Sequence, residues 1–406
     1  MKSNLFIPIL LGLCFISACG NSQTNSVTEK FDRTIIKQTE NTIKTGADQP
    51  ELYLDLLKEK RVGLVVNQSS LVKNKHLLDF LLENKINVIK IFAPEHGFRG
   101  NIDRGDHVKS EIDEKTGLPI VSMFGKNRRP TDEQLKDLDI MVFDIQDAGA
   151  RFFTYISSMH EVMEACASNS KELIVLDRPN PLGDYIDGPV RQTNFKSFVG
   201  MHPIPIVHGL TVGELARMIN GEKWLEAGKT CNLKVVKIAN YNHSIPYSLP
   251  VKPSPNLPND LSIRLYPSLC LFEATEISIG RGTLFPFQVI GYPDPEFGDS
   301  LFIPVDIEGM QTNPEQEGKV CYGLDLRELN PKEVQFTLKY IIDFYQKFKD
   351  QEKFFKRPEW FNLLVGNDVL IEQIENGLSE SEIKATWKPE LDSYKKMREK
   401  YLFYQP

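Results

Sequence analysis

The side chains best suited to acid–base chemistry in this sequence are carboxyl groups that follow short apolar runs. Glu95 lies in a turn-forming stretch at residues 94–97, and Asp144 and Asp147 lie at the end of an apolar run that begins at Ile140. A carboxyl group partly withdrawn from water can have a raised pKa and act as a general acid. Hydrolysis of a glycosidic bond commonly needs two carboxyl groups flanking that bond. Glu95 with one of the two aspartates is therefore a candidate catalytic pair.

Other interpretations of the same side chains are open. Glu95 could cap a helix or form an ion pair with Arg99, and Asp147 could pair with Arg151. Five side chains also offer ligands to a metal ion, namely Glu95, His96, Asp144, Asp147 and His208. Their spacing matches neither the HExxH pattern nor the zinc-deaminase pattern, so we expect no metal ion.

Arginines and aromatic residues supply candidates for substrate binding. Arg151, Arg178 and Arg281 could each bind a carboxylate through two N–H groups, although a single arginine is more often structural. Tyr155, with two phenylalanines before it at 152–153, could form the floor of a sugar site or simply pack a helix. The remaining candidates for substrate binding are Asn67, Arg99, Asp177, Asn180, His208, Asn256 and Glu276.

Short apolar runs must position these groups. They occupy residues 62–66, 88–92, 120–124, 140–145 and 173–176. Such continuous runs are typical of parallel strands that are buried on both faces. Helical patterns at 76–83, 131–136 and 158–167 lie between the runs, and capping boxes begin at Thr131 and Thr211. The alternation predicts an α/β fold with a Rossmann-like, doubly wound, mainly parallel sheet.

Polar residues gather directly after these runs, as Asn67, Glu95 and Asp177 illustrate. A further short run at 204–207 ends in His208 in the same way. In doubly wound sheets, ligands bind beyond the carboxyl ends of the strands. We therefore expect one site at this edge of the sheet.

Nucleotides and nucleic acids are poor candidates for the ligand. No GxGxxG motif follows the first predicted strand, and Lys223 stands where a P-loop ending in residues 228–230 would need glycine. The 406 residues carry 48 lysines and arginines against 55 acidic residues, a net charge of −7, whereas nucleic-acid binders are usually basic. We expect no nucleotide cofactor and no nucleic-acid partner.

The length suits more than one domain. We expect a Rossmann-like catalytic domain at 51–224 and a smaller α/β domain at 225–406 that closes the cleft. Within the second domain, a helical period runs from Val334 to Phe348, and another amphipathic helix is expected at 391–404.

The first residues have the pattern of a lipoprotein signal. Lys2 precedes a mostly apolar run, and Cys19 follows the small residues Ser17 and Ala18. We expect cleavage after a signal peptide at 1–18, lipid on Cys19 and a flexible tether at 19–50; a plain signal peptide is the alternative. The other four cysteines of the mature chain are widely spaced, so we expect them to be buried and unbridged.

Six motifs together resemble one known family. They are FAPEHGFRG at 92–100, FDIQDAGAR at 143–151, LDRPNP at 176–181, HPIPIVHG at 202–209, SPNLP at 254–258 and IGRGT at 279–283. The chain is thereby similar to the NamZ family of exo-β-N-acetylmuramidases, glycoside hydrolase family 171, once called domain of unknown function 1343. The resemblance runs from Val62 to Tyr404.

The resemblance implies release of N-acetylmuramic acid from the non-reducing ends of peptidoglycan fragments, in a cleft between a Rossmann-like domain and a smaller one. It also implies that Glu95 is the leading catalytic residue, with His96, Asp144 and Asp147 in the same cleft. An arginine would meet the lactyl carboxylate of the sugar. An anchored, periplasm-facing lipoprotein of the cell envelope would suit this substrate. The alternatives are a muropeptide-binding lipoprotein without activity and a metal-dependent hydrolase.

Overall fold

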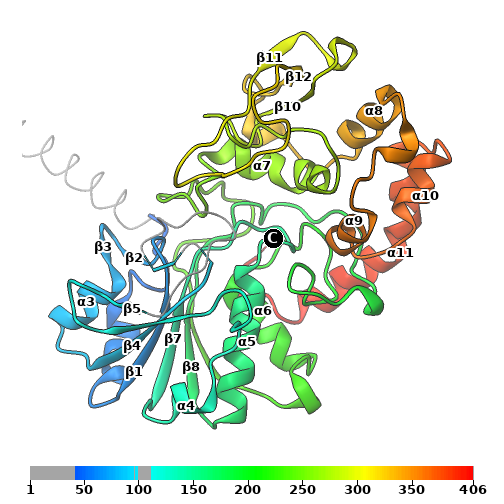
Figure 1. The fold of residues 1–406 in the computed structure, drawn as a ribbon. Coiled ribbons are helices and arrows are strands. Elements are labelled where there is room, and N and C mark those ends of the chain that lie inside the picture. Colours follow the sequence, from blue (N-terminus) through cyan, green and yellow to red (C-terminus); the bar gives the residue numbers. More distant parts are fainter. Residues whose placement is uncertain (1–41, 96, 99–110, 406) are drawn as a thin grey trace, which may run out of the picture. The chain divides into compact units, whose positions relative to one another are not determined.

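The structure is a computed structural model that describes residues 42–95, 97–98 and 111–405 (Figure 1). The predicted signal peptide, Cys19, His96 and Arg99 lie outside the described residues. Residues 44–406 form one compact unit, and only this unit is described below. The predicted tether at 19–50 extends too far along the chain. Lys44 pairs with Ala239 and Ala47 is fully buried, so these residues belong to the compact unit.

The main sheet confirms the predicted α/β architecture. Its parallel strands are β1 (Val62–Val66), β4 (Val88–Ala93), β6 (Pro119–Ser122), β7 (Ile140–Asp144), β8 (Glu172–Leu176) and β9 (Asn232–Val236). The order is β5-β6-β4-β1-β7-β8-β9, and β5 (Glu111–Ile112) runs antiparallel at one edge. All five residues of β1 and of β7 are buried, as expected for strands covered on both faces. The strand order reverses between β1 and β7, where doubly wound sheets place their ligands.

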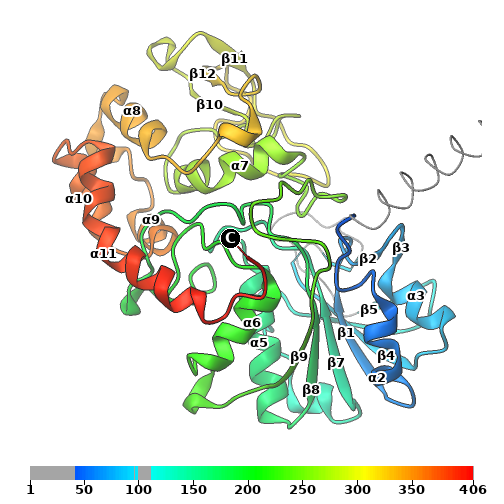
Figure 2. The same ribbon diagram turned by 180° about the vertical axis from the view of Figure 1, so that it is seen from behind.

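Helices cover both faces of this sheet. Figures 1 and 2 show α2 (Leu54–Leu57) and α3 (Leu77–Glu83) on one face, with α5 (Tyr155–Ser168) and α6 (Val212–Gly221) on the other. The capping boxes predicted at Thr131 and Thr211 are present and begin α4 (Asp132–Leu135) and α6. A small hairpin joins β2 (Leu71–Val72) to β3 (Lys75–His76).

Two expectations about this half of the chain were wrong. The apolar run at 204–207 is not a strand of the sheet, since Val207 makes only isolated bridges to Ala150 and Asp187. The sixth parallel strand is β9, which lies beyond residue 225, so the predicted boundary there cuts through the sheet. At this edge of the sheet the burial of β9 alternates instead of being continuous, and Lys234 is exposed.

The rest of the chain builds the region that lies above the sheet in Figure 1. It comprises α7 (Asp260–Leu269), β10 (Val289–Tyr292), β11 (Ser300–Phe302), β12 (Cys321–Asp325), α8 (Lys339–Lys347), α9 (Pro358–Val365), α10 (Leu370–Glu375) and α11 (Glu380–Glu399). The three strands form an antiparallel sheet in the order β10-β12-β11. Short 3-10 helices lie at Pro50–Leu52, Thr193–Phe195, Glu226–Gly228, Cys270–Ala274, Pro295–Phe297, Pro331–Glu333 and Gln351–Lys353.

Helix bounds in this region differ from the expected ones. The period that starts at Val334 becomes helical only at Lys339. The last helix, α11, starts at Glu380 with a capping box on Ser379 and ends at Glu399, before the aromatic tail. None of the helices in the described part is long and apolar enough to cross a membrane. The four cysteines at 166, 231, 270 and 321 are buried, and no disulfide joins them, as predicted.

The chain end returns to the sheet and docks on Asp177. The Tyr404 hydroxyl donates to Asp177 Oδ2 at 2.6 Å, and the Thr211 hydroxyl donates to the same oxygen at 2.8 Å. The Gly213 amide donates to the other carboxylate oxygen at 2.8 Å. Burial raises the pKa of Asp177 to about 7, although these hydrogen bonds oppose the shift. Asp177, expected to bind substrate, therefore fastens the C-terminus.

We expect this carboxyl group to make stability depend on pH. Its folded-state pKa of about 7 exceeds the usual value near 4, so the stability it contributes is full below about pH 4 and is lost as pH rises through 7. Asp177→Asn should remove this part of the slope when unfolding free energies are measured from pH 4 to 8. The exposed Asp55→Asn is the matched control and should keep the wild-type slope. An unchanged slope in the Asp177 variant would contradict the assignment.

Candidate active site

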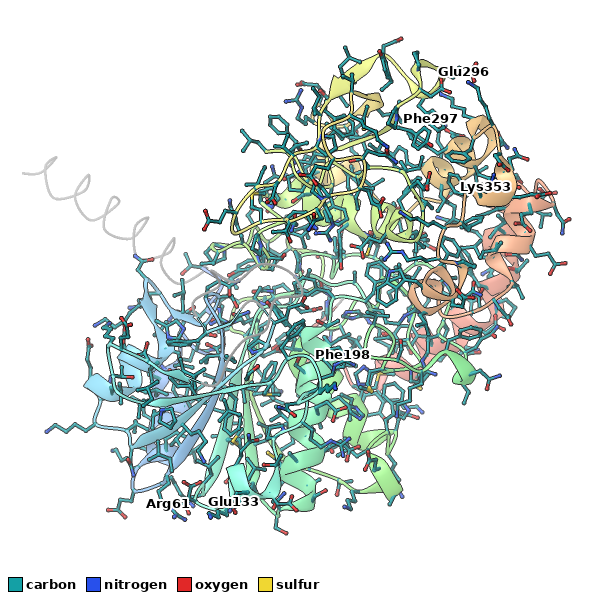
Figure 3. The ribbon with its side chains drawn as sticks, in the orientation of Figure 1. Arg61, Glu133, Phe198, Glu296, Phe297 and Lys353 are labelled. Atoms are coloured by element: carbon teal, nitrogen blue, oxygen red, sulfur yellow. The ribbon has the colours of Figure 1, made fainter. Side chains whose placement is uncertain are left out.

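One cavity of about 350 Å³ lies beyond the carboxyl ends of β4, β6 and β7 and is covered by the C-terminal region. This volume lies in the usual range of small-molecule sites. Its lining comprises Glu95, Phe124, Arg128, Phe152, Phe153, Thr154, Tyr155, Ser197, Phe198, Val199, Ser254, Asn256, Leu257, Tyr266, Cys270, Glu273, Arg281, Phe287, Trp360 and Leu364. Figure 3 labels Phe198, whose carbonyl accepts a 2.7 Å hydrogen bond from Ser157 in the first turn of α5.

Glu95 reaches this cavity from the turn that follows β4. The Gly97 amide donates to the Pro94 carbonyl at 3.0 Å, and Gly97 has a φ of 74°, which favours glycine. The Tyr155 hydroxyl donates to the Glu95 carbonyl at 3.3 Å, which ties the turn to α5. Burial raises the pKa of Tyr155, and the nearby negative charge of Glu95 raises it further. Glu95 is half-buried and has no ion-pair partner among the described residues.

The second carboxyl group of the cavity is Glu273, which sequence reasoning missed. It lies in the 3-10 helix Cys270–Ala274 that follows α7. A guanidinium nitrogen of Arg281 lies 2.7 Å from Glu273 Oε1, and Arg357 donates to the Glu273 carbonyl oxygen. The candidate chosen from the sequence, Glu276, lies outside the lining and is 3.4 Å from the Tyr292 hydroxyl. Nothing in the short acidic stretch indicated which glutamate faces the cavity.

The predicted aspartates do not face this cavity. Asp144 is fully buried, and Arg178 holds its two oxygens at 2.6 and 2.8 Å. Burial raises the pKa of Asp144, and the charge of Arg178 opposes that shift. Asp147 is buried too, and its Oδ2 lies 3.3 Å from His208 Nε2. The structure therefore differs from the predicted pairing of Glu95 with an aspartate.

Other residues that were predicted to bind substrate instead form hydrogen bonds in the protein interior. The buried Arg151 guanidinium donates to four backbone carbonyls, those of Pro189, Ile204, Leu364 and Val365, at 2.7 to 2.8 Å. Asn180 donates to the Leu210 carbonyl and accepts from the Leu182 amide, each at 2.8 Å. Asn67 is buried, accepts two hydrogen bonds from Ser69 and has its amide close to Tyr155.

The structure brings four predicted site residues to the cavity: Glu95, Tyr155, Asn256 and Arg281. Asn256 donates its amide to the Met310 carbonyl at 2.8 Å, while its buried Oδ1 has no partner within the described part of the chain. An unpaired buried carbonyl oxygen in a cavity wall is suited to accept a hydrogen bond from a ligand. Both phenylalanines that precede Tyr155 also line the cavity, in edge-to-face contact with Tyr266.

Arg128 is a further charged residue of the lining that the sequence did not single out. Its guanidinium carbon lies 4.1 Å from the centre of the Phe198 ring. No carboxylate of the described residues forms an ion pair with it, whereas the neighbouring Arg129 binds both Glu161 and Glu226. Arg128 thus offers the cavity a cation stacked on an aromatic ring. Within residues 42–95, 97–98 and 111–405 no three metal-ligating side chains come together.

Comparison with known proteins places both halves of the chain in one family. Residues 62–261 match the N-terminal model of exo-β-N-acetylmuramidase NamZ, and residues 264–404 match its C-terminal model. The chain is 39% identical over 384 residues to the peptidoglycan β-N-acetylmuramidase NamZ of Bacillus subtilis (strain 168), covering 89% of this chain and 91% of that protein.

Two solved structures from Bacteroides fragilis NCTC 9343, both of the domain-of-unknown-function 1343 family, are also similar. One has 47% identity and a TM-score of 0.83, covering 90% of this chain and 99% of its own. The other has 30% identity and a TM-score of 0.76, covering 90% and 100%.

Replacing Arg151 should distinguish a structural arginine from a substrate-binding one. Arg151→Lys cannot reach all four carbonyls, so we expect the free energy of unfolding to fall by about 3 kcal/mol. In the folded fraction, inhibition by ligands with and without a carboxylate group should weaken by the same factor, because the side chain does not line the cavity and acts only through the spacing of its walls. Chemical denaturation and steady-state kinetics measure the two effects. Arg327→Lys, in an exposed ion pair, is the control; a loss confined to ligands with a carboxylate group would contradict the structural role.

Proposed function

Because the chain belongs to the NamZ family of exo-β-N-acetylmuramidases, we propose that it is a glycosidase that releases N-acetylmuramic acid from the non-reducing ends of peptidoglycan fragments. The observation that carries this proposal is that Glu95 and Glu273 line one cavity of about 350 Å³, together with aromatic rings. Such a volume suits a single terminal sugar, as an exo-acting enzyme requires. Aromatic faces suit the apolar faces of a sugar ring.

Glu95 is the proposed general acid. It is half-buried and has no ion-pair partner among the described residues, so its carboxyl group is available to protonate the leaving glycosidic oxygen. Glu273 is the proposed second carboxyl group, in the place that the sequence assigned to an aspartate. Its ion pair with Arg281 fixes its position, from which it assists water, or the sugar's own acetamido group, at C1. Water supplies the hydroxyl of the released sugar and the proton that restores Glu95.

Arg128 is the proposed partner of the lactyl carboxylate. Of the three arginines predicted for this role, Arg151 and Arg178 are bound to protein groups and Arg281 pairs with Glu273. Arg128 lines the cavity without a carboxylate partner in the described part. A guanidinium group can bind a carboxylate through two parallel hydrogen bonds. The Oδ1 atom of Asn256 could accept a further hydrogen bond from the acetamido N–H.

We also propose that the chain is a lipoprotein of the cell envelope that serves in cell-wall turnover. The support is the order of Lys2, the apolar run and Cys19 in the sequence. Lipid on Cys19 and a tether would keep the catalytic unit near peptidoglycan fragments, facing the periplasm. Mass spectrometry of the membrane-extracted protein tests the lipid, and replacing Cys19 by serine should abolish it.

Replacing Glu95 tests the proposed acid. Glu95→Gln keeps the shape of the side chain but cannot donate a proton in the same way, so kcat should fall by about 10²- to 10⁴-fold. Turnover of 4-nitrophenyl β-N-acetylmuramide measures the rate, and calorimetry should show that N-acetylmuramic acid still binds. Glu276→Gln, outside the cavity, should keep normal kcat. Retained turnover in the Glu95 variant would exclude this residue, and binding without turnover in the wild type would indicate a receptor.

Replacing Arg128 tests recognition of the lactyl group. For Arg128→Gln, the inhibition constant of N-acetylmuramic acid should rise by about 10- to 100-fold, because a two-point contact with a carboxylate is lost. The inhibition constant of N-acetylglucosamine, which lacks the lactyl group, should stay the same. Arg129→Gln is the matched control and should leave both constants unchanged. Equal losses for both sugars in the Arg128 variant would contradict the assignment.

A further inference from the structure

Residues 151–155, here called the connecting segment, contact both halves of the chain that carry the proposed catalytic carboxyl groups. The segment comes after β7, and its last residue, Tyr155, begins α5. Its two phenylalanines contact Tyr266 of α7 edge to face, with ring centres 5.2 and 6.0 Å apart. Helix α7 leads directly into the 3-10 helix that contains Glu273. On this side the connecting segment is therefore packed against the helix that precedes the second carboxyl group.

The Tyr155 hydroxyl links the connecting segment to the other carboxyl-bearing residue. It donates to the Glu95 carbonyl oxygen at 3.3 Å, and within the described part of the chain Glu95 makes no other hydrogen bond. The bond from the Gly97 amide to the Pro94 carbonyl closes the turn around Glu95 but joins that turn only to itself. Tyr155 thus fixes Glu95 to the start of α5.

The two parts of the Tyr155 side chain have different surroundings. The ring lines the cavity and contacts Phe153 edge to face, with the ring centres 4.9 Å apart. The hydroxyl group is engaged with protein groups, since it donates to Glu95 and the side-chain amide of Asn67 lies close to it. Ser69 donates two hydrogen bonds to the Asn67 carbonyl oxygen, at 2.9 and 2.6 Å, which fixes this amide. Because burial raises the pKa of Tyr155, the hydroxyl keeps its proton and remains a donor.

A general acid has to lie within hydrogen-bond reach of the oxygen that it protonates, and a misplacement of about 1 Å can lower a rate by about 100-fold. We propose that Tyr155 is a positioning residue for the general acid: its hydroxyl group holds the Glu95 backbone so that the carboxyl group reaches the leaving glycosidic oxygen. This inference rests on the proposed glycosidase function. The connecting segment then sets the place of the acid relative to Glu273. Tyr155, expected to bind the sugar, contributes its ring to the cavity wall and its hydroxyl group to the acid.

This role has a signature in how the rate depends on the leaving group of the substrate. A 2,4-dinitrophenolate ion is stable and departs without a proton, whereas a phenolate ion departs slowly unless an acid protonates it. The two leaving groups share the same ring, so the substrates differ mainly in their need for Glu95. A misplaced acid slows the release of phenol alone. A disturbed cavity or fold slows both reactions by the same factor, and the ratio of the two rates does not depend on the fraction of folded protein.

Tyr155→Phe removes the hydroxyl group and keeps the ring. For phenyl β-N-acetylmuramide, kcat should fall by about 10- to 100-fold while KM stays within about twofold, because the lost contact acts only on proton transfer. For 2,4-dinitrophenyl β-N-acetylmuramide, kcat/KM should stay within about threefold. Tyr394→Phe is the matched control, since the buried Tyr394 hydroxyl also donates to a backbone carbonyl, that of His208, at 2.6 Å, and Tyr394 does not line the cavity. The control should have the wild-type ratio of the two rates.

Glu95→Gln separates this inference from the proposed function. It should show the same selective loss, with a larger fall for the phenyl glycoside, because it removes the acid itself. If the Glu95 variant shows that pattern, equal losses on both substrates in Tyr155→Phe, or no loss on either, would overturn the positioning role. A Glu95 variant that slows both substrates equally, or neither of them, would instead overturn Glu95 as the proposed acid.

Discussion

The buried guanidinium of Arg151 is the contact on which the geometry of the site depends. It binds two carbonyls of the 189–204 segment and two at the end of α9, Leu364 and Val365. Phe152 and Phe153 follow it directly in the chain, and Leu364 and Trp360 belong to α9; all four line the cavity. One side chain thus sets the spacing between the wall built on the sheet and the wall built on the C-terminal region. Its charge is costly to bury, and only neutral carbonyl dipoles compensate it: burial lowers the pKa of Arg151 to about 9.

Most of the polar groups at the strand ends likewise bind other groups of the protein in its interior. Asp144 pairs with Arg178, Asp177 fastens Tyr404, and Asn180 bridges two backbone groups. Parallel strands that end together leave backbone donors and acceptors that must be satisfied without water. The polar clusters seen in the sequence therefore largely form hydrogen bonds and ion pairs inside the protein. The cavity lies further from the strand ends, where Glu95 extends on its turn and the C-terminal region supplies the other wall.

Elements of the fold and residues of the site were predictable from the sequence where neighbouring residues alone mark them. The strands β1, β4 and β7 were predictable because burial on both faces leaves a continuous apolar run. The edge strand β9 contains Lys234, and Lys237 directly follows it, so no continuous apolar run marks this strand in the sequence. The predicted domain boundary was therefore placed before β9, although β9 belongs to the main sheet. Glu95 was predictable because it follows a strand directly. Glu273 and Arg128 were not, because only the packing of the two halves decides that they face one cavity, and the partners of Arg151 are backbone groups that leave no trace in residue type.

The two carboxyl groups of the proposed mechanism come from different halves of the chain, and this has a consequence for how the fold acts. Glu95 follows a strand of the Rossmann-like sheet, whereas Glu273 follows α7 in the C-terminal region. The reversal point between β1 and β7, used by other doubly wound proteins to hold a phosphate, has no glycine-rich loop here. A charged phosphate could be held by one sheet edge and a helix N-terminus. N-acetylmuramic acid carries its hydroxyl, acetamido and lactyl groups around a ring, so we infer that it has to be enclosed from two sides. The C-terminal region provides the second side together with Glu273, the second carboxyl group of the proposed mechanism.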